Sequence, residues 1–219
     1  MRWLRTSCLL ALALLLLVPA AASAAKSKPK TTHTTAGTAA AEHALIGTND
    51  LGPGWVAGTA STKAESLSCG GTSAAVAGVV EIGAAASPTF RASGSGPFVS
   101  QAAFVYGSDS QAAALWEHVA GAKVLACLAK SVAGGGVKGI GFTVLRHEEL
   151  SRPAGGARSS AYRVVVQAKT KAQKVTAYVD MLLLGRGDAV TALSFASFTQ
   201  PVDTGLELSL ARVVAGRLA

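Results

Sequence analysis

The chain lacks the short motifs that mark the common hydrolases and nucleotide-binding enzymes. It has four histidines, His33, His43, His118 and His147, and no two of them have the H-x-x-x-H spacing of a zinc site. The G-x-S-x-G turn of a nucleophilic serine is missing. Glycines 134–136 lack the G-x-x-x-x-G-K-[ST] spacing that cradles a phosphate. The sequence therefore predicts a protein that is not an enzyme, with no catalytic residue, no cofactor and no metal.

Aromatic and charged residues are also scarce, at 5% and 15% of the chain, whereas half of the residues are apolar. A core can form, and it will be built largely from small side chains. The net charge of +8 overstates the charge of the folded part, because residues 42–219 hold 15 Lys and Arg against 12 Asp and Glu. A nucleic-acid-binding face needs basic residues concentrated on one surface, so this balance predicts no nucleic-acid partner.

The first 24 residues have the three parts of a secretory signal peptide. Arg2 and Arg5 precede the apolar run Cys8–Val18, and the small residues Ala22-Ser23-Ala24 follow. The run has 11 residues, whereas a membrane-spanning helix needs about 20. We therefore predict a secreted, extracytoplasmic protein with no transmembrane segment after signal cleavage. The alternative is that the signal is kept as an N-terminal anchor.

Cysteine is rare, with three residues in the chain, and Cys8 lies within the predicted signal. Cleavage would leave Cys69 and Cys127, and two cysteines in an oxidising compartment are expected to form a disulfide. The bond would close a loop of about 59 residues, which is worth roughly 4 kcal/mol of stability in the chain-entropy model. The alternative is that both are small buried thiols.

Residues 25–41 have the polar sequence AKSKPKTTHTTAGTAAA, which contains no large apolar side chain. Such a segment buries too little surface to order itself, so we predict a flexible linker over 25–41 and a single domain over 42–219. The domain opens with Leu51-Gly-Pro-Gly-Trp55, where Pro and two glycines indicate a turn and Trp55 is expected to pack in the core.

Hydrophobic periodicity and capping patterns predict the elements of this domain. The expected helices are Glu42–Asp50, Ser73–Ile82, Ser108–Lys130 and Asp203–Leu218, and the expected strands are Ser87–Ala92, Phe98–Tyr106, Ile140–Leu150, Ser160–Lys169, Lys174–Leu184 and Ala189–Phe198. Short links between the later strands favour antiparallel neighbours. The predicted fold is α+β: an antiparallel β-sheet packed by one long helix and a C-terminal helix.

Charged residues alternate with apolar ones in the predicted strand Ser160–Lys169, which indicates that one side of the sheet is exposed to water. Seven basic residues cluster in this part of the sequence: Arg146, Arg152, Arg158, Arg163, Lys169, Lys171 and Lys174. They could form a basic rim for an anionic envelope polymer, although a solvated surface also explains them. Glu148 and Glu149 are adjacent on a strand, point to opposite faces and cannot share a proton easily. Arg186-Gly187-Asp188 is explained by a hairpin turn rather than by adhesion.

Four of these features together resemble one known family. They are Leu51-Gly-Pro-Gly-Trp55, Tyr106-Gly-Ser-Asp109 before the long helix, Cys127 late in that helix, and the Arg186-Gly-Asp188 turn. The pattern is similar to the PknH-like extracellular sensor domains of actinobacterial receptor kinases and their secreted relatives, over residues 42–219. The resemblance implies an α+β domain with a cleft for an envelope ligand and no catalysis. Those domains typically have two disulfides, whereas this chain has cysteines for one.

The sequence thus favours a secreted, non-enzymatic, ligand-binding or sensor-like domain of the cell envelope, with a cleft between the long helix and the sheet as the expected site. The expected partner is an envelope small molecule or an anionic polymer. One alternative is a structural or adhesive envelope protein that binds anionic polymers. The other is a secreted enzyme, which would need His118 or His147 beside a carboxylate and a hydroxyl in a cleft.

The predicted processing can be tested on protein purified from its native cell. Intact-mass spectrometry should give a chain that begins at residue 25, with a mass two hydrogens below that of the reduced polypeptide. A full-length, fully reduced chain would contradict the signal peptide and the disulfide together.

Overall fold

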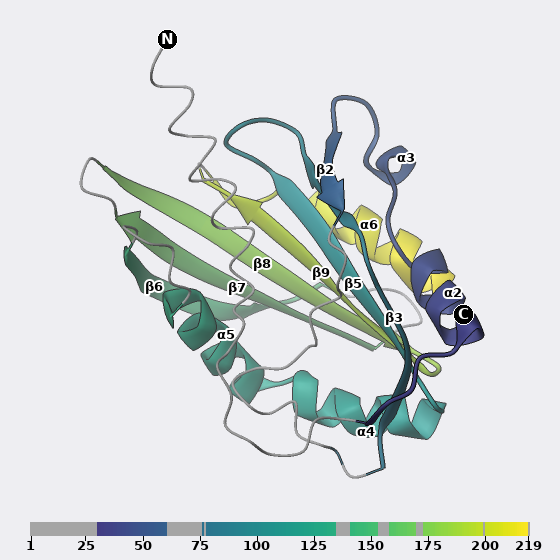
Figure 1. The fold of residues 1–219 in the computed structure, drawn as a ribbon. Helices are drawn as coiled ribbons and strands as arrows, with labels where there is room; N and C mark the ends of the chain where they lie inside the picture. The colour runs from purple at the N-terminus through teal and green to yellow at the C-terminus, as the bar shows by residue number, and fades with distance from the viewer. Residues whose placement is uncertain are drawn as a thin grey trace.

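The structure is a computed structural model that describes residues 30–60, 76, 78–134, 141–152, 158–169, 173–198 and 200–218. It confirms the α+β fold with a largely antiparallel sheet (Figure 1). The strands are β1 (Lys30–Thr31), β2 (Val56–Ala60), β3 (Val80–Ala86), β4 (Pro88–Arg91), β5 (Phe98–Tyr106), β6 (Gly141–Leu150), β7 (Arg158–Lys169), β8 (Lys174–Arg186) and β9 (Ala189–Ser197). The helices are α2 (Thr35–His43), α3 (Thr48–Leu51), α4 (Asp109–Val119), α5 (Ala122–Gly134) and α6 (Thr204–Arg217).

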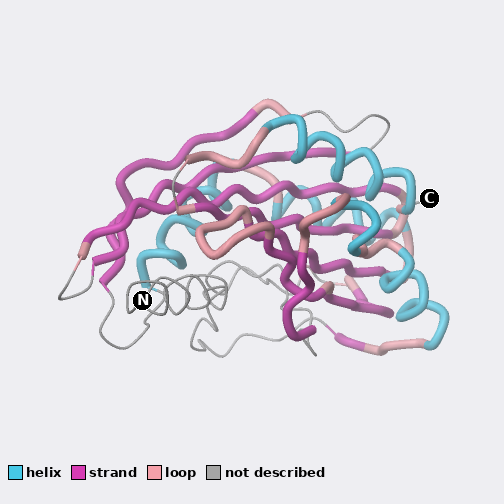
Figure 2. The backbone as a smooth tube through the Cα atoms, turned by 90° about the horizontal axis from the view of Figure 1, so that it is seen from above, coloured by secondary structure: helices cyan, strands magenta, loops and turns pink. Residues whose placement is uncertain are grey.

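The strands form one sheet in the order β1-β3-β5-β9-β8-β7-β6, with β4 paired to β5 and β2 paired to β4 (Figure 1). Figure 2 shows the strands and helices from above. All pairings are antiparallel except the short one between β1 and β3. The predicted strand Phe98–Tyr106 is confirmed residue for residue as β5. The four predicted strands after the long helix are confirmed as β6 to β9, with small differences at their ends.

The predicted single helix Ser108–Lys130 is wrong, because the structure divides it into α4 and α5. Ser108 caps α4, since its side chain accepts a hydrogen bond from the Gln111 backbone N–H. The backbone at Ala120 is extended, and this ends α4. Gly121 follows with a φ of +153°, a value that favours glycine. The Gly121 N–H donates to the Tyr162 hydroxyl at 2.6 Å, which anchors the break on β7. In the described part of the chain no single helix is long and apolar enough to cross a membrane. The helix α4 and the segment Val124–Lys130 would be long and apolar enough only when taken together, and a bend of 61° separates them.

The predicted flexible linker 25–41 is wrong over its second half, because Thr35–His43 forms α2 on the sheet. The contact needs glycine: a Cβ on Gly37 would lie 2.3 Å from the Ile82 carbonyl oxygen, and one on Gly83 would lie 2.1 Å from Gly37. Gly37 and Ala41 are buried there. A helix of small residues therefore packs by close backbone approach, without the large side chains whose absence suggested disorder.

Two other local predictions differ from the structure. The predicted helix Glu42–Asp50 is instead the end of α2 followed by the short helix α3. The predicted helix Ser73–Ile82 overlaps β3 at Val80–Ile82, and most of its other residues lie outside the described part of the chain. The turn at Leu51–Trp55 is confirmed, with positive φ at both of its glycines, and Trp55 packs against the core.

Both faces of the central sheet are covered, so the prediction of one water-exposed face is wrong. Side chains on one face, such as Val99 and Phe195, pack with α2 and α6, whereas Phe104 on the other face packs with α4 and α5. Successive residues of β5 alternate between these two cores, as the pleat of a strand requires. Arg163, which was expected to be solvated, is 9% exposed.

The glycine contact between α2 and β3 gives a direct test. Gly37→Ala should lower the free energy of unfolding by about 1–3 kcal/mol, the usual cost of overpacking a core, in urea denaturation. Gly216→Ala is the matched control, because Gly216 lies in α6 with open space around its Cα, and alanine favours a helix. Equal midpoints for the two variants would contradict the close packing of α2.

Candidate functional site

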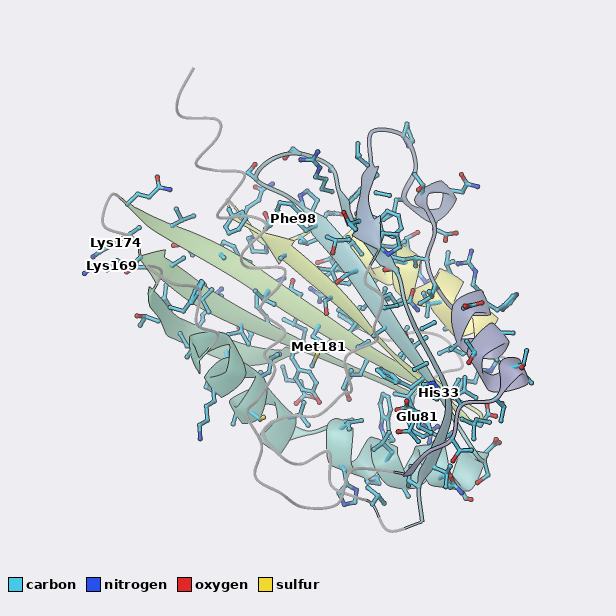
Figure 3. All side chains as sticks on the ribbon, in the orientation of Figure 1. His33, Glu81, Phe98, Lys169, Lys174 and Met181 are labelled. Atoms are coloured by element: carbon cyan, nitrogen blue, oxygen red, sulfur yellow. The ribbon has the colours of Figure 1, made fainter. Side chains whose placement is uncertain are left out.

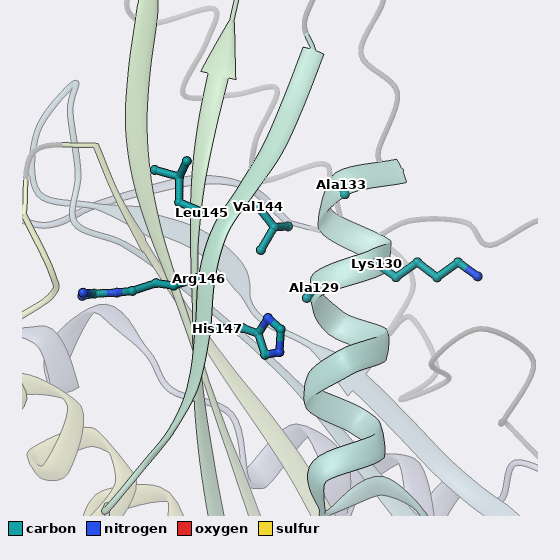
Figure 4. Close-up of a pocket in the computed structure, with 7 residues that line it drawn as sticks. All are labelled: Ala129, Lys130, Ala133, Val144, Leu145, Arg146 and His147. Carbon is teal, nitrogen blue, oxygen red and sulfur yellow. The ribbon is translucent and has the colours of Figure 1, made fainter.

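A shallow groove of about 570 Å³ lies between α5 and the edge strand β6 (Figure 4). We call it the α5–β6 groove, and it is lined by Ala129, Lys130, Ala133, Val144, Leu145, Arg146 and His147. Its position agrees with the expected cleft between the long helix and the sheet, on the α5 half of the predicted helix.

The α5–β6 groove joins small apolar surface to one imidazole. Val144 and His147 point from β6 towards the helix, where Ala129 and Ala133 leave room for them (Figure 4). The head groups of Lys130 and Arg146 extend away from the groove in opposite directions (Figure 4). The groove can therefore contact the apolar part of a small molecule and offer it one hydrogen-bonding ring.

The outer edge of β6 carries features that discourage pairing with another strand. β6 ends the sheet order, and a register shift between Val144 and Arg146 makes Leu145 a bulge that is 52% exposed. Arg146 and Glu148 follow, 3.8 Å apart and on the same face. Bulges and charges on an edge strand oppose edge-to-edge association, so this side of the groove stays open to small ligands.

The most heavily buried charges lie on the opposite face of the sheet, under α6. Arg163 on β7 donates to Asp180 on β8 through Nε and Nη2, at 2.6 and 2.5 Å. The two residues are direct partners in the β7–β8 register. Asp180 raises the pKa of the Arg163 guanidinium by accepting these hydrogen bonds. A bidentate pair of this kind is both strong and geometrically specific.

Glu207 of α6 completes what we call the ion cluster: Arg152, Arg163, Asp180 and Glu207. The Arg152 Nε donates to Glu207 Oε2 at 2.6 Å, and the Glu207 side chain is fully buried. Burial raises the pKa of Glu207 to about 7, and its hydrogen bond with Asp180 acts in the same direction. The Asp203 side chain caps α6 by accepting from the Leu206 N–H at 2.9 Å, and the Glu207 side chain binds Arg152 and takes no part in the cap.

The described members of the predicted basic rim do not form one continuous surface. Arg152 and Arg163 belong to the ion cluster, and Arg158 lies over the Trp116 ring with its Cζ 5.6 Å from the centroid. Lys169 and Lys174 lie together at one end of the sheet, far from His33 and Glu81 at the other (Figure 3). Lys171 lies outside the described residues. The fold therefore places these basic residues, which are close in the sequence, on two faces of the sheet and at two ends of the β7–β8 hairpin.

The remaining predicted residues are placed as follows. Cys127 is half-buried on α5, and Cys69 lies outside the described residues, so the Cys69–Cys127 disulfide stays a prediction. His33 lies 2.8 Å from Glu81, and His118 Nδ1 lies 2.9 Å from the Ala114 carbonyl oxygen within its own helix. Gly187 and Asp188 form the predicted hairpin turn, with a φ of +55° at Gly187.

In the part of the chain that the structure describes, no group of three or more His, Cys, Asp or Glu side chains could hold a metal ion. Neither a protein-family model nor a curated protein matches this chain.

The ion cluster was missed at the level of sequence, although one signal was present. Asp180 interrupts the apolar stretch 177–184 of β8, and the hairpin register places it opposite Arg163. Pairing these two strands on the sequence would have brought the charges together. Glu207 had no comparable signal, because its position on α6 also fits a helix cap.

The Arg163–Asp180 pair can be tested by removing one partner. Arg163→Met should cost about 3–5 kcal/mol of unfolding free energy, since it leaves a buried carboxylate without its guanidinium. Arg146→Met is the matched control on β6, where the side chain is 59% exposed, and it should change stability by less than about 0.5 kcal/mol. Similar losses for both variants in denaturant titrations would contradict the assigned burial.

Proposed function

We propose that this protein is an exported, non-enzymatic binding domain and that its ligand is a small molecule seated in the α5–β6 groove. The observation that carries the proposal is the groove itself, in which His147 meets the apolar surface of Val144, Ala129 and Ala133 (Figure 4). Ligand sites commonly combine apolar walls with a few polar groups that fix orientation.

The arrangement of charges supports a binding role over a catalytic one. The two acids of the ion cluster, Asp180 and Glu207, are fully buried under α6 and hydrogen-bonded to arginines. They lie on the face of the sheet opposite to the groove. Their tight pairing suits a structural element better than a site that must exchange protons with a substrate.

The predicted signal peptide supports a role outside the cytoplasm. The resemblance to PknH-like extracellular sensor domains agrees with a binding function in the cell envelope. The alternative of an adhesive protein for anionic polymers is less favoured, because the arginines expected to form its basic rim take part in internal contacts.

A dye titration with matched variants tests the proposal. The probe is 1-anilinonaphthalene-8-sulfonate, whose fluorescence rises on contact with apolar surface. Ala133→Trp fills the groove and should weaken dye binding about tenfold or more, which corresponds to the loss of about 1.4 kcal/mol of binding energy.

Ala126→Trp is the control, because Ala126 is exposed on the same helix and does not line the groove. It should leave dye binding unchanged. Equal weakening by both variants, or no dye binding by the folded wild type, would contradict the groove as the site. Native mass spectrometry of the purified protein would report any molecule that it retains.

A further inference from the structure

Only one of the two carboxylate oxygens of Glu207 accepts a hydrogen bond. Its Oε2 accepts from Arg152, whereas Oε1 is fully buried and has no donor among the described residues. An ionised oxygen in this position would carry a large desolvation cost, because a buried acceptor without a donor loses its water and gains nothing. The groups around Oε1 therefore decide how Glu207 is held.

The charged groups that face Glu207 come from three neighbouring strands. Arg152 follows β6 and is occupied by Oε2. Arg163 on β7 is bound to Asp180 by two hydrogen bonds, and its Nη2 stays 4.0 Å from Oε1, beyond hydrogen-bond range. Asp180 on β8 is the other carboxylate beside Glu207, since both carboxylates approach the same Arg163 Nη2, at 2.5 Å for Asp180 and 4.0 Å for Glu207.

Two carboxylates can hydrogen-bond to each other only when one of them carries a proton. We propose that Asp180 and Glu207 share one proton in the folded protein, and that this proton fastens the first half of α6 to the sheet. Aspartic dyads show the same behaviour, since two carboxylates at one site cannot both ionise easily. The shared proton also supplies the missing donor for Oε1.

Two further charges lie near this cluster on β6. Glu148 acts on the Arg163 guanidinium, and Arg146 lies 3.8 Å from Glu148, so these two exposed charges offset each other. Neither of them supplies the donor that the buried Oε1 lacks.

The sign of the pH dependence follows from the proton. Burial and Asp180 raise the pKa of Glu207 from 4.5 to about 7, so the folded chain holds a proton that the unfolded chain has released. The contribution to stability is fully present below the unfolded pKa and is lost as the pH rises through the folded one. The pH range over which this contribution is lost therefore runs from about pH 4.5 to pH 7, and the stability falls as the pH rises towards neutral.

Other polar contacts of α6 lie towards its far end. Arg186 donates to the Ala215 carbonyl at 3.3 Å, and Arg217 donates to Asp50 at 2.7 and 2.9 Å. The Arg217 hydrogen bond lowers the pKa of Asp50, so that carboxylate stays ionised throughout this pH range. Loss of the shared proton should therefore loosen residues 204–210 and leave the C-terminal half of α6 in place.

The experiment measures urea unfolding and backbone amide exchange of the full mature chain at pH 5.5 and pH 8. The equilibrium constant for unfolding of the wild type should rise roughly 30-fold between these pH values, as linkage requires for a proton held with a pKa near 7. After correction for intrinsic exchange rates, amides of residues 207–210 should lose protection at pH 8, whereas those of 214–217 should keep it.

Glu207→Gln is the informative variant, because its amide donates to Asp180 without a titrating proton. It should remove the roughly 30-fold pH dependence, and Glu149→Gln, at an exposed position on β6, should retain it. If Glu207→Gln does not fold, the carboxyl ¹³C shift of Glu207 in the wild type decides. A protonated carboxyl at pH 5.5 supports the proposal; an ionised one, or the same pH dependence in Glu207→Gln and wild type, overturns it.

Discussion

The ion pair between Arg163 and Asp180 dictates how the second half of the chain must fold. The two side chains meet in the middle of the long β7–β8 hairpin and are almost completely buried. Such a pair is tolerable only beneath a cover that excludes water and satisfies the remaining polar atoms. The helix α6 provides the cover, and it brings Glu207 and, through it, Arg152 into the same network. The pair thereby favours one strand register and links the C-terminal helix to the sheet.

The strands β5 to β9 were predictable because their periodicity is local, whereas β2 and β3 were not predicted. Alternation along Phe98–Tyr106 and the short links between the last four strands gave the elements and their antiparallel pairing. The break between α4 and α5 was not visible, since Ala120-Gly121 lies in a continuous helical pattern and is stopped by a hydroxyl from β7. The order in residues 35–41 was missed for another reason. Composition measures how much side-chain surface is available, and α2 is held instead by two glycines that bring backbones together.

The location of the groove followed from the expected layers, whereas its lining depended on details that no single strand reveals. A bulge at Leu145 sets which residues of β6 point towards α5, and it puts His147 on that side. The basic residues are close in the sequence and were predicted to form one surface, but the geometry of the hairpin places them in different surroundings. Arg163 faces α6, Arg158 covers an indole, and Lys169 lies at the end of the sheet. Proximity along the chain is a poor guide to a charged surface whenever the residues lie on paired strands.

The first described strand begins soon after the apolar N-terminal run, which limits how far the domain can stand from a membrane. Lys30 pairs with Val80, so residues 19–29 separate the apolar run from the sheet. Fully extended, these residues span about 40 Å at most. If the apolar run stays in the membrane, the sheet end near β1 is kept within that distance of the lipid. The domain could then sample ligands near the membrane surface, whereas the cleaved form would diffuse away from it.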